Sequence, residues 1–574
     1  MRIEPVVAAT PASPKAWIAL GIMCLIYLAL AFPAVVGKSV TVDEGGNIPV
    51  GYNILSTGDF RYCEYHPPLM NLLLAAPVKM FEPEATTTTL KALPDNMKFK
   101  FWPNSYVFAD RFRNDYQHVI VLARTTTVLL VAGLGVLLFL WARMLAPVRG
   151  DVAGLLAAGL VWFSPNILAH STLASSDAGI MIFTTVALWS FHCFLTKPDL
   201  PQAALAGLGL GLALLTKGTA VFLVLLYPVL AWVWRAYHPQ TTLKTLLRGF
   251  AVLLLVALWV VNSGFLFQGS FTLAGKYTLE SGAMKTLFAF VPKWLPVPLP
   301  LNFVGAFDRQ LREASEGYNS FLFGQALMSG RWYYYLALLS IKTPLTSMAL
   351  VGTAMWAAWR AGFMRRFESW MLLIPAGVLF FAFSVLSHKQ LGIRMIMPAA
   401  VLFWLWCSVA LASSRLGRRF DIAALVLALG TVATTAWTCP NYIAYFNPFA
   451  GDADRAHRLA NDSNLDWGQD LIGLKKYMDE KKLDSIQLLY FGRIDPAIYG
   501  IKYTVPKLTE IKPGPLAVSV TLYGTRAIVT DHGRGVPMNG MDPQKLGLGA
   551  PITSIGHSIQ IYDVPAKPLS AEKK

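Results

Sequence analysis

Acidic residues at the ends of two apolar runs could carry chemistry in this sequence. Asp43 and Glu44 follow the first run, and Asp177 stands at the start of a later one. A carboxylate at a membrane surface can take a proton from a hydroxyl group and act as a general base. Acids are also common at helix N-termini, where they accept hydrogen bonds from the backbone. For Asp43 and Glu44 the sequence leaves both interpretations open.

A second set consists of basic residues in or beside apolar runs. They are Arg124, Lys217, Lys342, Lys389 and Arg394. A charge within a span indicates a functional site, or a long side chain that reaches the lipid headgroups. For each of these residues alone, the two explanations are equally good. Gathered on one side of the membrane, such cations suit an anionic ligand such as a lipid phosphate.

A short proline-containing segment follows in the first long loop. His66 and Pro67, with Pro68 and Leu69, introduce an apolar stretch that reaches Val78. Proline favours the first turn of a helix, so this segment predicts a short helix lying at the membrane interface. An ordinary structured loop is the alternative.

Asp466 and Trp467 belong to a polar segment, Asp-Ser-Asn-Leu-Asp-Trp-Gly-Gln-Asp, at residues 462–470. One interpretation is an amphipathic helix whose N-cap is Ser463 or Asn464. The other is a lid, or an edge that contacts an acceptor near the mouth of a site. The sequence does not decide between them.

The elements that must position these residues are membrane helices. Of the 574 residues, 55% are hydrophobic and 14% are charged, which is typical of a membrane protein. About eleven apolar runs approach the length that spans a bilayer. They cover residues 16–36, 119–141, 152–167, 178–195, 203–215, 218–234, 250–267, 333–359, 370–386, 395–411 and 422–437.

The connections between these runs predict the orientation. With the N-terminus in the cytoplasm, every connection on the inner side contains Lys or Arg, as cytoplasmic loops do. These residues are Arg143, Arg149, Lys197, Arg235, Lys244, Arg248, Arg360, Arg365, Arg366, Arg415, Arg418 and Arg419. The run 203–215 is short, but merging it with the next run would move the last clusters to the wrong side. The acids and cations described above then share the outer side.

The chain is predicted to have two parts. Residues 1–439 form a transmembrane catalytic domain with long outer loops at 38–118 and 268–332. Residues 440–574 contain stretches of period-two alternation and a helical pattern, which predict a small extracytoplasmic α+β domain.

Composition also bears on the classes of ligand. The net charge of +16 is explained by basic cytoplasmic loops, and no soluble basic face indicates nucleic-acid binding. No cluster of His and Cys predicts a metal site, and no cofactor is predicted with certainty. Carboxylates alone leave a divalent cation, Mg²⁺ or Mn²⁺, as an open alternative.

The order of several motifs resembles a known family. These motifs are Asp43-Glu44, His66-Pro67-Pro68-Leu69, the turn ending in Asp177, Lys342-Thr343-Pro344, Gly392-Ile393-Arg394 followed by Met397-Pro398, and residues 462–470. Together, over nearly the whole chain, they resemble bacterial phospholipid-carrier-dependent glycosyltransferases of the GT-C class. These enzymes are relatives of the protein O-mannosyltransferases and of the lipid A aminoarabinose transferase. The resemblance implies an α-helical polytopic membrane protein of GT-C type.

The resemblance also implies a reaction. An inverting transferase would move a sugar from a polyprenyl-phosphate carrier to an acceptor hydroxyl, on a protein Ser or Thr or on a glycolipid. Asp43 would be the catalytic base, with Glu44 beside it and Asp177 as the acid of the second loop. The implied location is a bacterial inner membrane with the C-terminal domain in the periplasm. The partners would be the sugar donor, the lipid or protein acceptor, and the bilayer.

The remaining residues receive roles from the same chemistry. A departing polyprenyl phosphate needs preorganised cations, for which Lys217, Lys389 and Arg394 are the first candidates, with Arg124 and Lys342. Residues expected to contact substrate from the loops are His66, Pro67, Asp466 and Trp467. A glycan polymerase or ligase is an alternative enzyme. A transporter or flippase of lipid-linked sugars is another, although it would place charges near the bilayer midplane.

Overall fold

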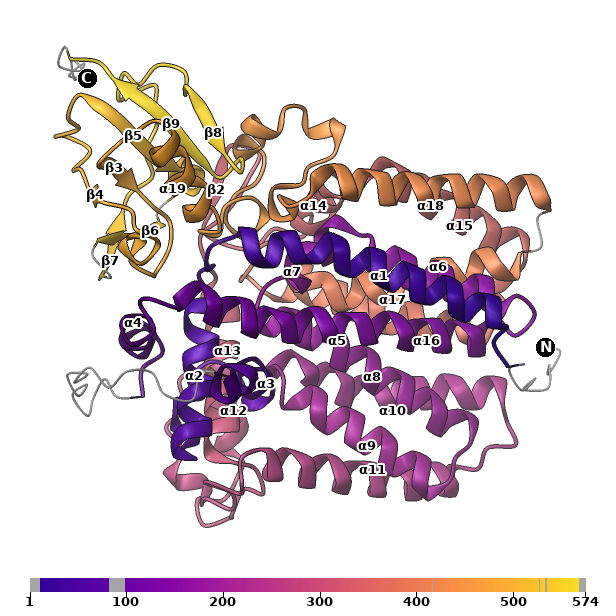
Figure 1. Cartoon of the computed structure of the whole chain (residues 1–574). Helices are drawn as coiled ribbons and strands as arrows, with labels where there is room; N and C mark the ends of the chain where they lie inside the picture. The colour runs from indigo at the N-terminus through magenta and orange to yellow at the C-terminus, as the bar shows by residue number, and fades with distance from the viewer. Residues whose placement is uncertain (1–10, 82–98, 415–416, 526, 532–533, 567–574) are drawn as a thin grey trace.

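The computed structural model describes residues 11–81, 99–414, 417–525, 527–531 and 534–566. Long helices run side by side through most of this part of the chain, and a small sheet-containing domain sits at one end (Figure 1). The first helix starts at the opposite end of the bundle. The predicted class, a polytopic helical protein with a small α+β C-terminal region, is confirmed.

Eight helices in the described residues are long and apolar enough to cross a membrane, three of them when an adjoining turn is included. They are α1 (Pro14–Gly37), α5 (Tyr116–Leu145), α8 (Ser176–Thr196), α10 (Val221–Tyr237), α11 (Leu243–Gly264), α16 (Phe367–Phe381), α17 (Met397–Ser413) and α18 (Arg418–Thr438). Each of them falls on one of the apolar runs predicted from the sequence.

Two further spans are broken helices. α6 (Gly150–Trp162) meets α7 (Pro165–Ser171) at 64°, and α14 (Tyr334–Lys342) meets α15 (Leu345–Arg360) at 113°. A proline stands at each break, where its missing N–H and fixed φ suit the start of a new helix. α9 (Leu200–Leu214) has 15 residues. At 1.5 Å per residue it is about 22 Å long, shorter than the roughly 30 Å hydrocarbon core.

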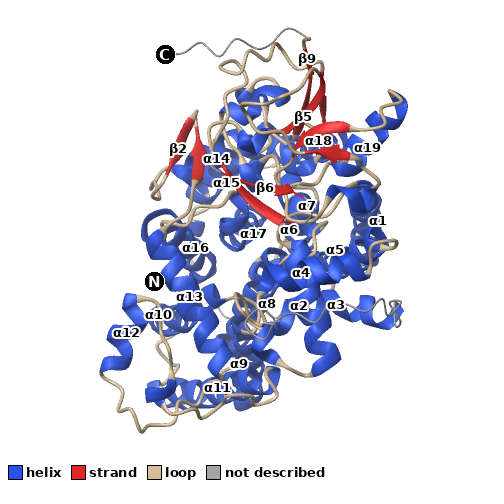
Figure 2. Cartoon of the chain, turned by 90° about the vertical axis from the view of Figure 1, so that its left-hand side faces the viewer, coloured by secondary structure: helices blue, strands red, loops and turns tan. Residues whose placement is uncertain are grey.

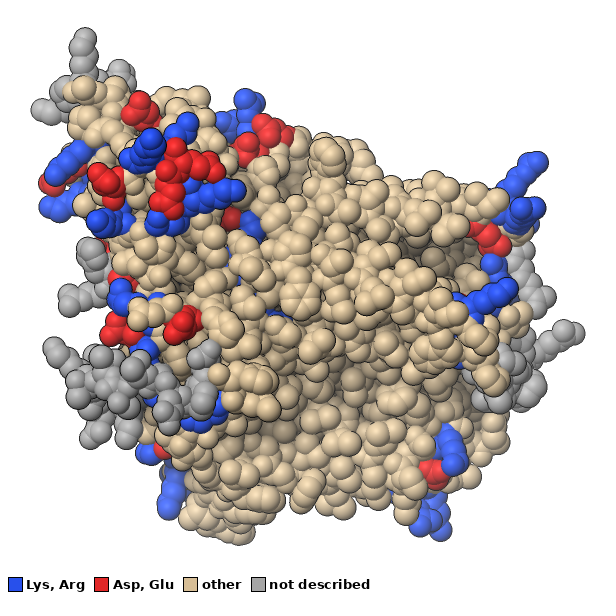
Figure 3. Space-filling model, in the orientation of Figure 1, with Lys and Arg blue, Asp and Glu red and all other residues tan. Residues whose placement is uncertain are grey.

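The lateral surface of the helical bundle is apolar, as a lipid-facing surface must be. Figure 3 shows Lys, Arg, Asp and Glu gathered at the two ends, with a broad, almost uncharged band between them. Large apolar side chains of the spans are exposed, among them Trp232, Trp259 and Trp437. Exposed apolar surface of this extent would be unfavourable in water, so the chain is a multi-pass membrane protein.

Ion pairs and hydrogen bonds tie together the connections predicted to be cytoplasmic. Arg149, between α5 and α6, lies 3.0 Å from Asp421 at the start of α18. Asp151 accepts a hydrogen bond from the backbone N–H of Ser13, just before α1, at 3.2 Å. These ends of three spans therefore meet on one side, as the basic connections predict. Arg415 lies outside the described residues, and the cytoplasmic assignment itself stays a prediction.

The two long outer loops fold into short helices and a hairpin at the other end (Figure 2). These are α2 (Glu44–Thr57), α3 (Pro68–Phe81), α4 (Phe101–Arg111), α12 (Gly282–Ala289), α13 (Leu301–Glu316), β1 (Ser320–Leu322) and β2 (Gln325–Leu327). The helix predicted after His66 is therefore present and begins at Pro68. Its apolar face joins a core formed by α2, α4 and the start of α5.

The C-terminal region contains a five-stranded sheet with the order β4-β3-β5-β9-β8. Its strands are β3 (Ile486–Leu489), β4 (Tyr503–Thr504), β5 (Gly514–Ser519), β8 (Thr553–Ile555) and β9 (Ile559–Val564). α19 (Leu471–Glu480) packs on this sheet through Leu471, Leu474 and Met478. A separate hairpin, β6 (Ala527–Asp531) and β7 (Arg534–Met538), completes the region. Tyr442 and Trp467 join the apolar core of the spans, and the boundary at residue 439 stays a prediction.

Candidate active site

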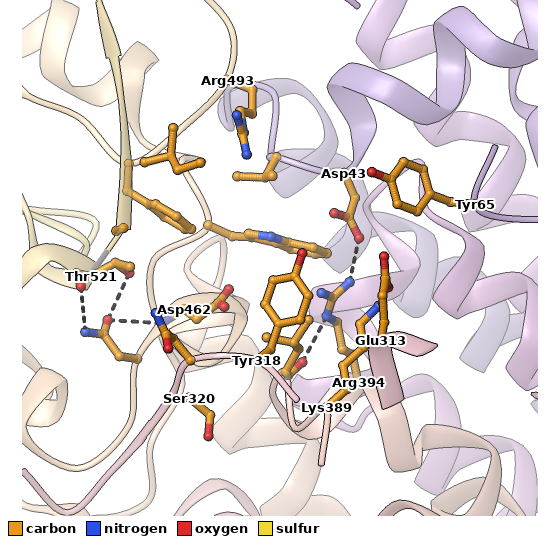
Figure 4. A pocket seen from close by; sticks show the side chains of 18 of the residues that line it. Asp43, Tyr65, Glu313, Tyr318, Ser320, Lys389, Arg394, Asp462, Arg493 and Thr521 are labelled. Atoms are coloured by element: carbon orange, nitrogen blue, oxygen red, sulfur yellow. Dashed lines mark hydrogen bonds and ion pairs between the residues drawn. The ribbon is translucent and has the colours of Figure 1, made fainter. Parts of the chain in front are cut away.

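A cavity of about 520 Å³ opens where the outer ends of the spans meet the outer loops and the C-terminal region (Figure 4). Four charged residues that line it, Asp43, Lys217, Lys389 and Arg394, lie at the outer ends of the spans and are called the floor. The outer loops and the C-terminal region supply most of the remaining lining. A concave site with converging charged groups is the natural candidate for an active site.

Asp43 on the floor stands at the N-cap position of α2, yet its side chain makes no capping hydrogen bond. Instead, Arg394 Nη1 donates to Asp43 Oδ2 at 2.6 Å. The Asp43 side chain is 34% exposed, which leaves part of the carboxylate open to the cavity. The capping interpretation is therefore wrong for Asp43.

Asp177 is held from two sides. Arg394 Nη1 lies 2.9 Å from Asp177 Oδ2, and Lys217 Nζ lies 2.6 Å from Asp177 Oδ1. Only 2% of the Asp177 side chain is exposed. The structure thus brings together four residues predicted from the sequence, with Arg394 as the bridge between the two acids.

The loop before Arg394 is shaped by the polar segment 462–470. Gly392 has a φ of 78°, a left-handed conformation that favours glycine. A Cβ at this position would lie 2.4 Å from Ser463 Oγ. Asn464 Oδ1 accepts a hydrogen bond from the N–H of Ile393 at 3.0 Å, and Ser463 Oγ donates to the carbonyl of Leu391 at 3.0 Å. The first half of the segment therefore holds the backbone that presents Arg394.

The second half of the segment runs beside the residues that lead to Asp43. The N–H of Val42 donates to the carbonyl of Trp467 at 3.1 Å, and the N–H of Ser39 donates to the carbonyl of Gln469 at 2.9 Å. Lys38 Nζ forms an ion pair with Asp470 at 2.5 Å. One polar segment consequently positions both partners of the Asp43–Arg394 pair.

Trp467 and Asp466 differ in their surroundings. The Trp467 ring lines the cavity, and the guanidinium carbon of Arg394 lies 4.2 Å from its centroid. Asp466 is buried and accepts hydrogen bonds from the N–H groups of Gly468 and Thr521. Burial raises the pKa of Asp466 to about 7. Because α19 begins at Leu471, a helix capped by Ser463 or Asn464 is wrong.

Lys389 and His66 complete the cationic side of the cavity. Lys389 Nζ lies 2.5 Å from Glu313 Oε2. Burial lowers the pKa of Lys389, while Glu313 acts in the opposite direction. His66 Nδ1 is buried and has no hydrogen-bond partner among the described residues. Burial, with the nearby Lys217 and Lys389, lowers the pKa of His66 well below its ordinary value. Pro67 is buried just before α3.

Glu44 lies away from the cavity, although it is next to Asp43 in the chain. Its carboxylate accepts hydrogen bonds from Thr41, from the N–H of Ala174, and from Arg124 Nε and Nη2 at 2.7 Å each. Both side chains of the Glu44–Arg124 pair are 0% exposed. Arg124 also donates to the carbonyls of Val35, Lys38 and Ser39. The structure therefore gives Glu44 and Arg124 a shared supporting position and does not bring them to the floor.

Lys342 is likewise directed into the protein. Its Nζ donates to the carbonyls of Ile443 at 2.9 Å and Asn464 at 2.5 Å. The residue is 1% exposed and does not line the cavity. Phosphate binding by Lys342 stays a prediction that this geometry does not favour.

Sequence reasoning did not single out several residues of the cavity. Asp462 belongs to the polar segment and lines the cavity with a φ of 57°, so its place in that motif was an available signal. Tyr318, Trp102 and Arg493 also line the cavity. They lie in extramembrane segments where such residue types are common, and only the tertiary fold brings them to the site.

The donor set does not fit a divalent cation. Among the described residues, no group of three or more His, Cys, Asp and Glu side chains could hold a metal ion. The two acids nearest the floor, Asp43 and Asp177, already face Arg394 and Lys217. The arrangement instead offers one partly open carboxylate among fixed cations, which suits proton transfer beside an anionic leaving group.

Residues 59–272 match the family described as dolichyl-phosphate-mannose-protein mannosyltransferase. The matched segment contains Asp177 and Lys217, together with most of the first outer loop. This part of the chain is therefore similar to a family of membrane glycosyltransferases. The match agrees with the order of motifs, which resembles that of the relatives of the protein O-mannosyltransferases.

Solved structures give distant matches to this chain. ArnT from Cupriavidus metallidurans, bound to undecaprenyl phosphate, is 14% identical over 92% of this chain and 98% of its own, with a TM-score of 0.45. The archaeal oligosaccharyltransferase AglB from Archaeoglobus fulgidus is 14% identical over 74% of this chain and 55% of its own, with a TM-score of 0.47. The Pmt1–Pmt2 protein O-mannosyltransferase complex of S. cerevisiae is 18% identical over 46% and 36%, with a TM-score of 0.30. No curated protein sequence matches the chain.

Proposed function

We propose that this glycosyltransferase moves a sugar from a polyprenyl-phosphate carrier to an acceptor hydroxyl on the outer side of a bacterial inner membrane, with inversion. The observation that carries the proposal is Arg394 on the floor of the cavity, which bridges Asp43 and the buried Asp177. The matched family is named for a sugar donor linked to a polyprenol phosphate, which agrees with this chemistry. The C-terminal region would then lie in the periplasm.

Asp43 is the general base in this proposal. Its carboxylate is 34% exposed, whereas Asp177 is 2% exposed and bound by two cations. Asp43 takes the proton of the acceptor hydroxyl as the oxygen attacks the anomeric carbon on the face opposite the phosphate. The bond between that carbon and the phosphate oxygen breaks, and polyprenyl phosphate leaves with the bonding electrons. A single displacement inverts the configuration.

Lys217 and Arg394 stabilise the charge that grows on the departing phosphate. Lys217 Nζ has three N–H groups, and one side-chain hydrogen bond, to Asp177, engages it in the described structure. Arg394 uses Nε and Nη1 for protein contacts, and no acceptor among the described residues takes its Nη2. Both side chains can therefore keep their carboxylate partners and still donate to phosphate. Losing one such donor typically costs about 3 kcal/mol of transition-state stabilisation.

The test uses the full chain reconstituted in liposomes with synthetic polyprenyl-phosphate sugars. Release of free polyprenyl phosphate is measured for the wild type, for Asp43→Asn, and for Asp59→Asn as a control. Asp59 is an outer-loop acid that pairs with Arg61 outside the cavity. We expect the wild type and the control to release polyprenyl phosphate, and Asp43→Asn to be slower by about 10²–10⁴-fold.

Two outcomes would contradict the proposal. Movement of the intact lipid-linked sugar across the bilayer without release of polyprenyl phosphate would identify a transporter. Release by Asp43→Asn at the wild-type rate would remove Asp43 from the role of base. Mass analysis of the sugar-bearing product separates a protein Ser or Thr, a glycolipid and a growing glycan, and so distinguishes a transferase from a polymerase or ligase.

A further inference from the structure

Arg493 differs from the other cations that line the cavity. Lys217 pairs with Asp177, Arg394 with Asp43 and Asp177, and Lys389 with Glu313. Among the described residues, no carboxylate lies within ion-pair distance of Arg493, and none of its side-chain N–H groups finds an acceptor. The cavity therefore contains one guanidinium whose donors are left for something other than this protein.

An aromatic ring holds this guanidinium in place. The guanidinium carbon of Arg493 lies 4.3 Å from the centroid of the Trp102 ring, which belongs to α4 and also lines the cavity. A guanidinium held over a ring by a cation–π contact keeps its N–H groups available as donors. We call Arg493 and Trp102 the roof pair, because they come from the extramembrane walls.

The backbone on both sides of Arg493 is fixed. The carbonyl of Gly492 accepts a hydrogen bond from Thr530 Oγ1 at 2.6 Å. Ile494 is 2% exposed and packs in the core of the first outer loop with Val40 and Ile48. Arg493 is thus anchored in the seam between the C-terminal region and that loop. An arginine fixed before a ligand arrives loses little conformational entropy when it binds one.

The unpaired guanidinium of Arg493 determines which kind of ligand the roof pair can bind. A partly buried cation without a counter-charge is unfavourable, and an anion in contact with it relieves that penalty. The planar fork of a guanidinium matches the two oxygens of a carboxylate or a phosphate. Figure 4 shows Arg493 pointing into the cavity on the opposite side of Asp43 from Arg394. A second anion can therefore be held while the floor cations hold the first.

We propose that Arg493 and Trp102 form a subsite for a phosphate or carboxylate group carried by the acceptor. The inference rests on the proposed function, in which the floor cations bind the phosphate of the donor and Asp43 takes the proton of the acceptor. The acceptor then presents its hydroxyl to Asp43 while its anionic group contacts Arg493. The roof pair consequently favours acceptors that carry negative charge near the attacked hydroxyl.

The experiment measures binding of inorganic phosphate to the full chain in neutral-lipid nanodiscs by calorimetry. We expect the wild type to bind phosphate at two sites, and Arg493→Gln to lose one of them. Arg493→Lys keeps the charge without the planar fork and should bind at the second site about tenfold more weakly. Arg113→Gln is the matched control, because Arg113 lies near the same seam, contacts Asp110 and Asp495, and does not line the cavity.

A second arm separates the acceptor from the donor as the source of the anion. Polyprenyl phosphate at saturation should occupy the floor and leave the Arg493-dependent phosphate site unchanged. Displacement from that site by polyprenyl phosphate would assign the roof to the donor and overturn the inference. Unaltered two-site binding by Arg493→Gln would overturn it as well. Because this binding is measured without transfer, a failure of the proposed reaction would be seen separately.

Discussion

Replacing Glu44 with glutamine tests whether this residue stabilises the fold around the site or takes part in the transfer reaction. The Glu44 carboxylate receives hydrogen bonds from the N–H and Oγ1 of Thr41, from the N–H of Ala174, and from Nε and Nη2 of Arg124. All these groups are donors, so the NH₂ of a glutamine would face donors in place of one oxygen. Arg124, which is 0% exposed, would lose its counter-charge.

The size of the effect follows from this burial. Neutralising one partner of a buried ion pair typically costs about 3–5 kcal/mol, so the folded-to-unfolded ratio should fall roughly a hundredfold to several thousandfold. Asp43→Asn alters a side chain that is 34% exposed. Its effect on the free energy of unfolding should stay within about 1 kcal/mol, as is usual for pairs near solvent. Its effect on transfer should instead be the loss of a general base.

The assay compares the two variants in nanodiscs. Tryptophan fluorescence gives the temperature of unfolding, and the transfer rate per folded molecule is measured at a temperature where both variants are folded. Glu44→Gln should unfold at a lower temperature and keep a rate within about threefold of the wild type, because no atom of Glu44 lines the cavity. If Glu44→Gln unfolds like the wild type but is as slow as Asp43→Asn, Glu44 takes part in the chemistry and this reasoning is refuted.

Three further predictions test other parts of the site. Gly392→Ala should slow transfer about tenfold or more, since its φ is 78° and its Cβ would meet Ser463 Oγ at 2.4 Å. Gly417→Ala, with a φ of 99° but no atom within 4 Å of its Cβ, should leave the transfer rate unchanged. Burial raises the pKa of Asp466 from 3.8 to about 7, so the folded chain binds this proton more tightly than the unfolded chain. The stability from that difference is present below pH 3.8 and is lost as the pH rises to about 7. Asp466→Asn should therefore remove this part of the slope in unfolding temperature between pH 3.8 and about 7, and an unchanged slope would contradict the prediction. EDTA should leave the transfer rate unchanged, and a loss that Mn²⁺ restores would contradict the assignment of charge stabilisation to Lys217 and Arg394 without a metal.

The membrane-spanning helices could be predicted from the sequence, because contact with lipid restricts their residue types. A helix that faces hydrocarbon must be apolar over its whole length, and the predicted runs accordingly fall on helices. The sharp bends at Pro165 and Pro344 were not predicted, because the runs remain apolar across them. Backbone groups freed at such bends must be satisfied by neighbouring chain, and that tertiary packing is not visible in a single apolar run.

Only some of the cations predicted for the site reach the cavity. Lys217 and Arg394 reach the cavity, whereas Arg124 and Lys342 donate to buried carbonyls, and Arg124 also to a carboxylate. The four residues give the same signal in the sequence, because each is a charge near the outer end of a span. Which partner satisfies such a charge depends on tertiary packing that no single span encodes. The sequence did not indicate a role for Arg493, because arginine is common in extramembrane segments.

The contact between residues 39–42 and 467–469 joins the beginning of the chain to a segment made more than four hundred residues later. Asp43 is synthesised early, but residues 467–469, which position the backbone before it, are synthesised only after the last span. We therefore expect the nascent protein to acquire activity only when translation is nearly complete. A chain that ends before residue 467 should insert into the membrane and fail to transfer sugar.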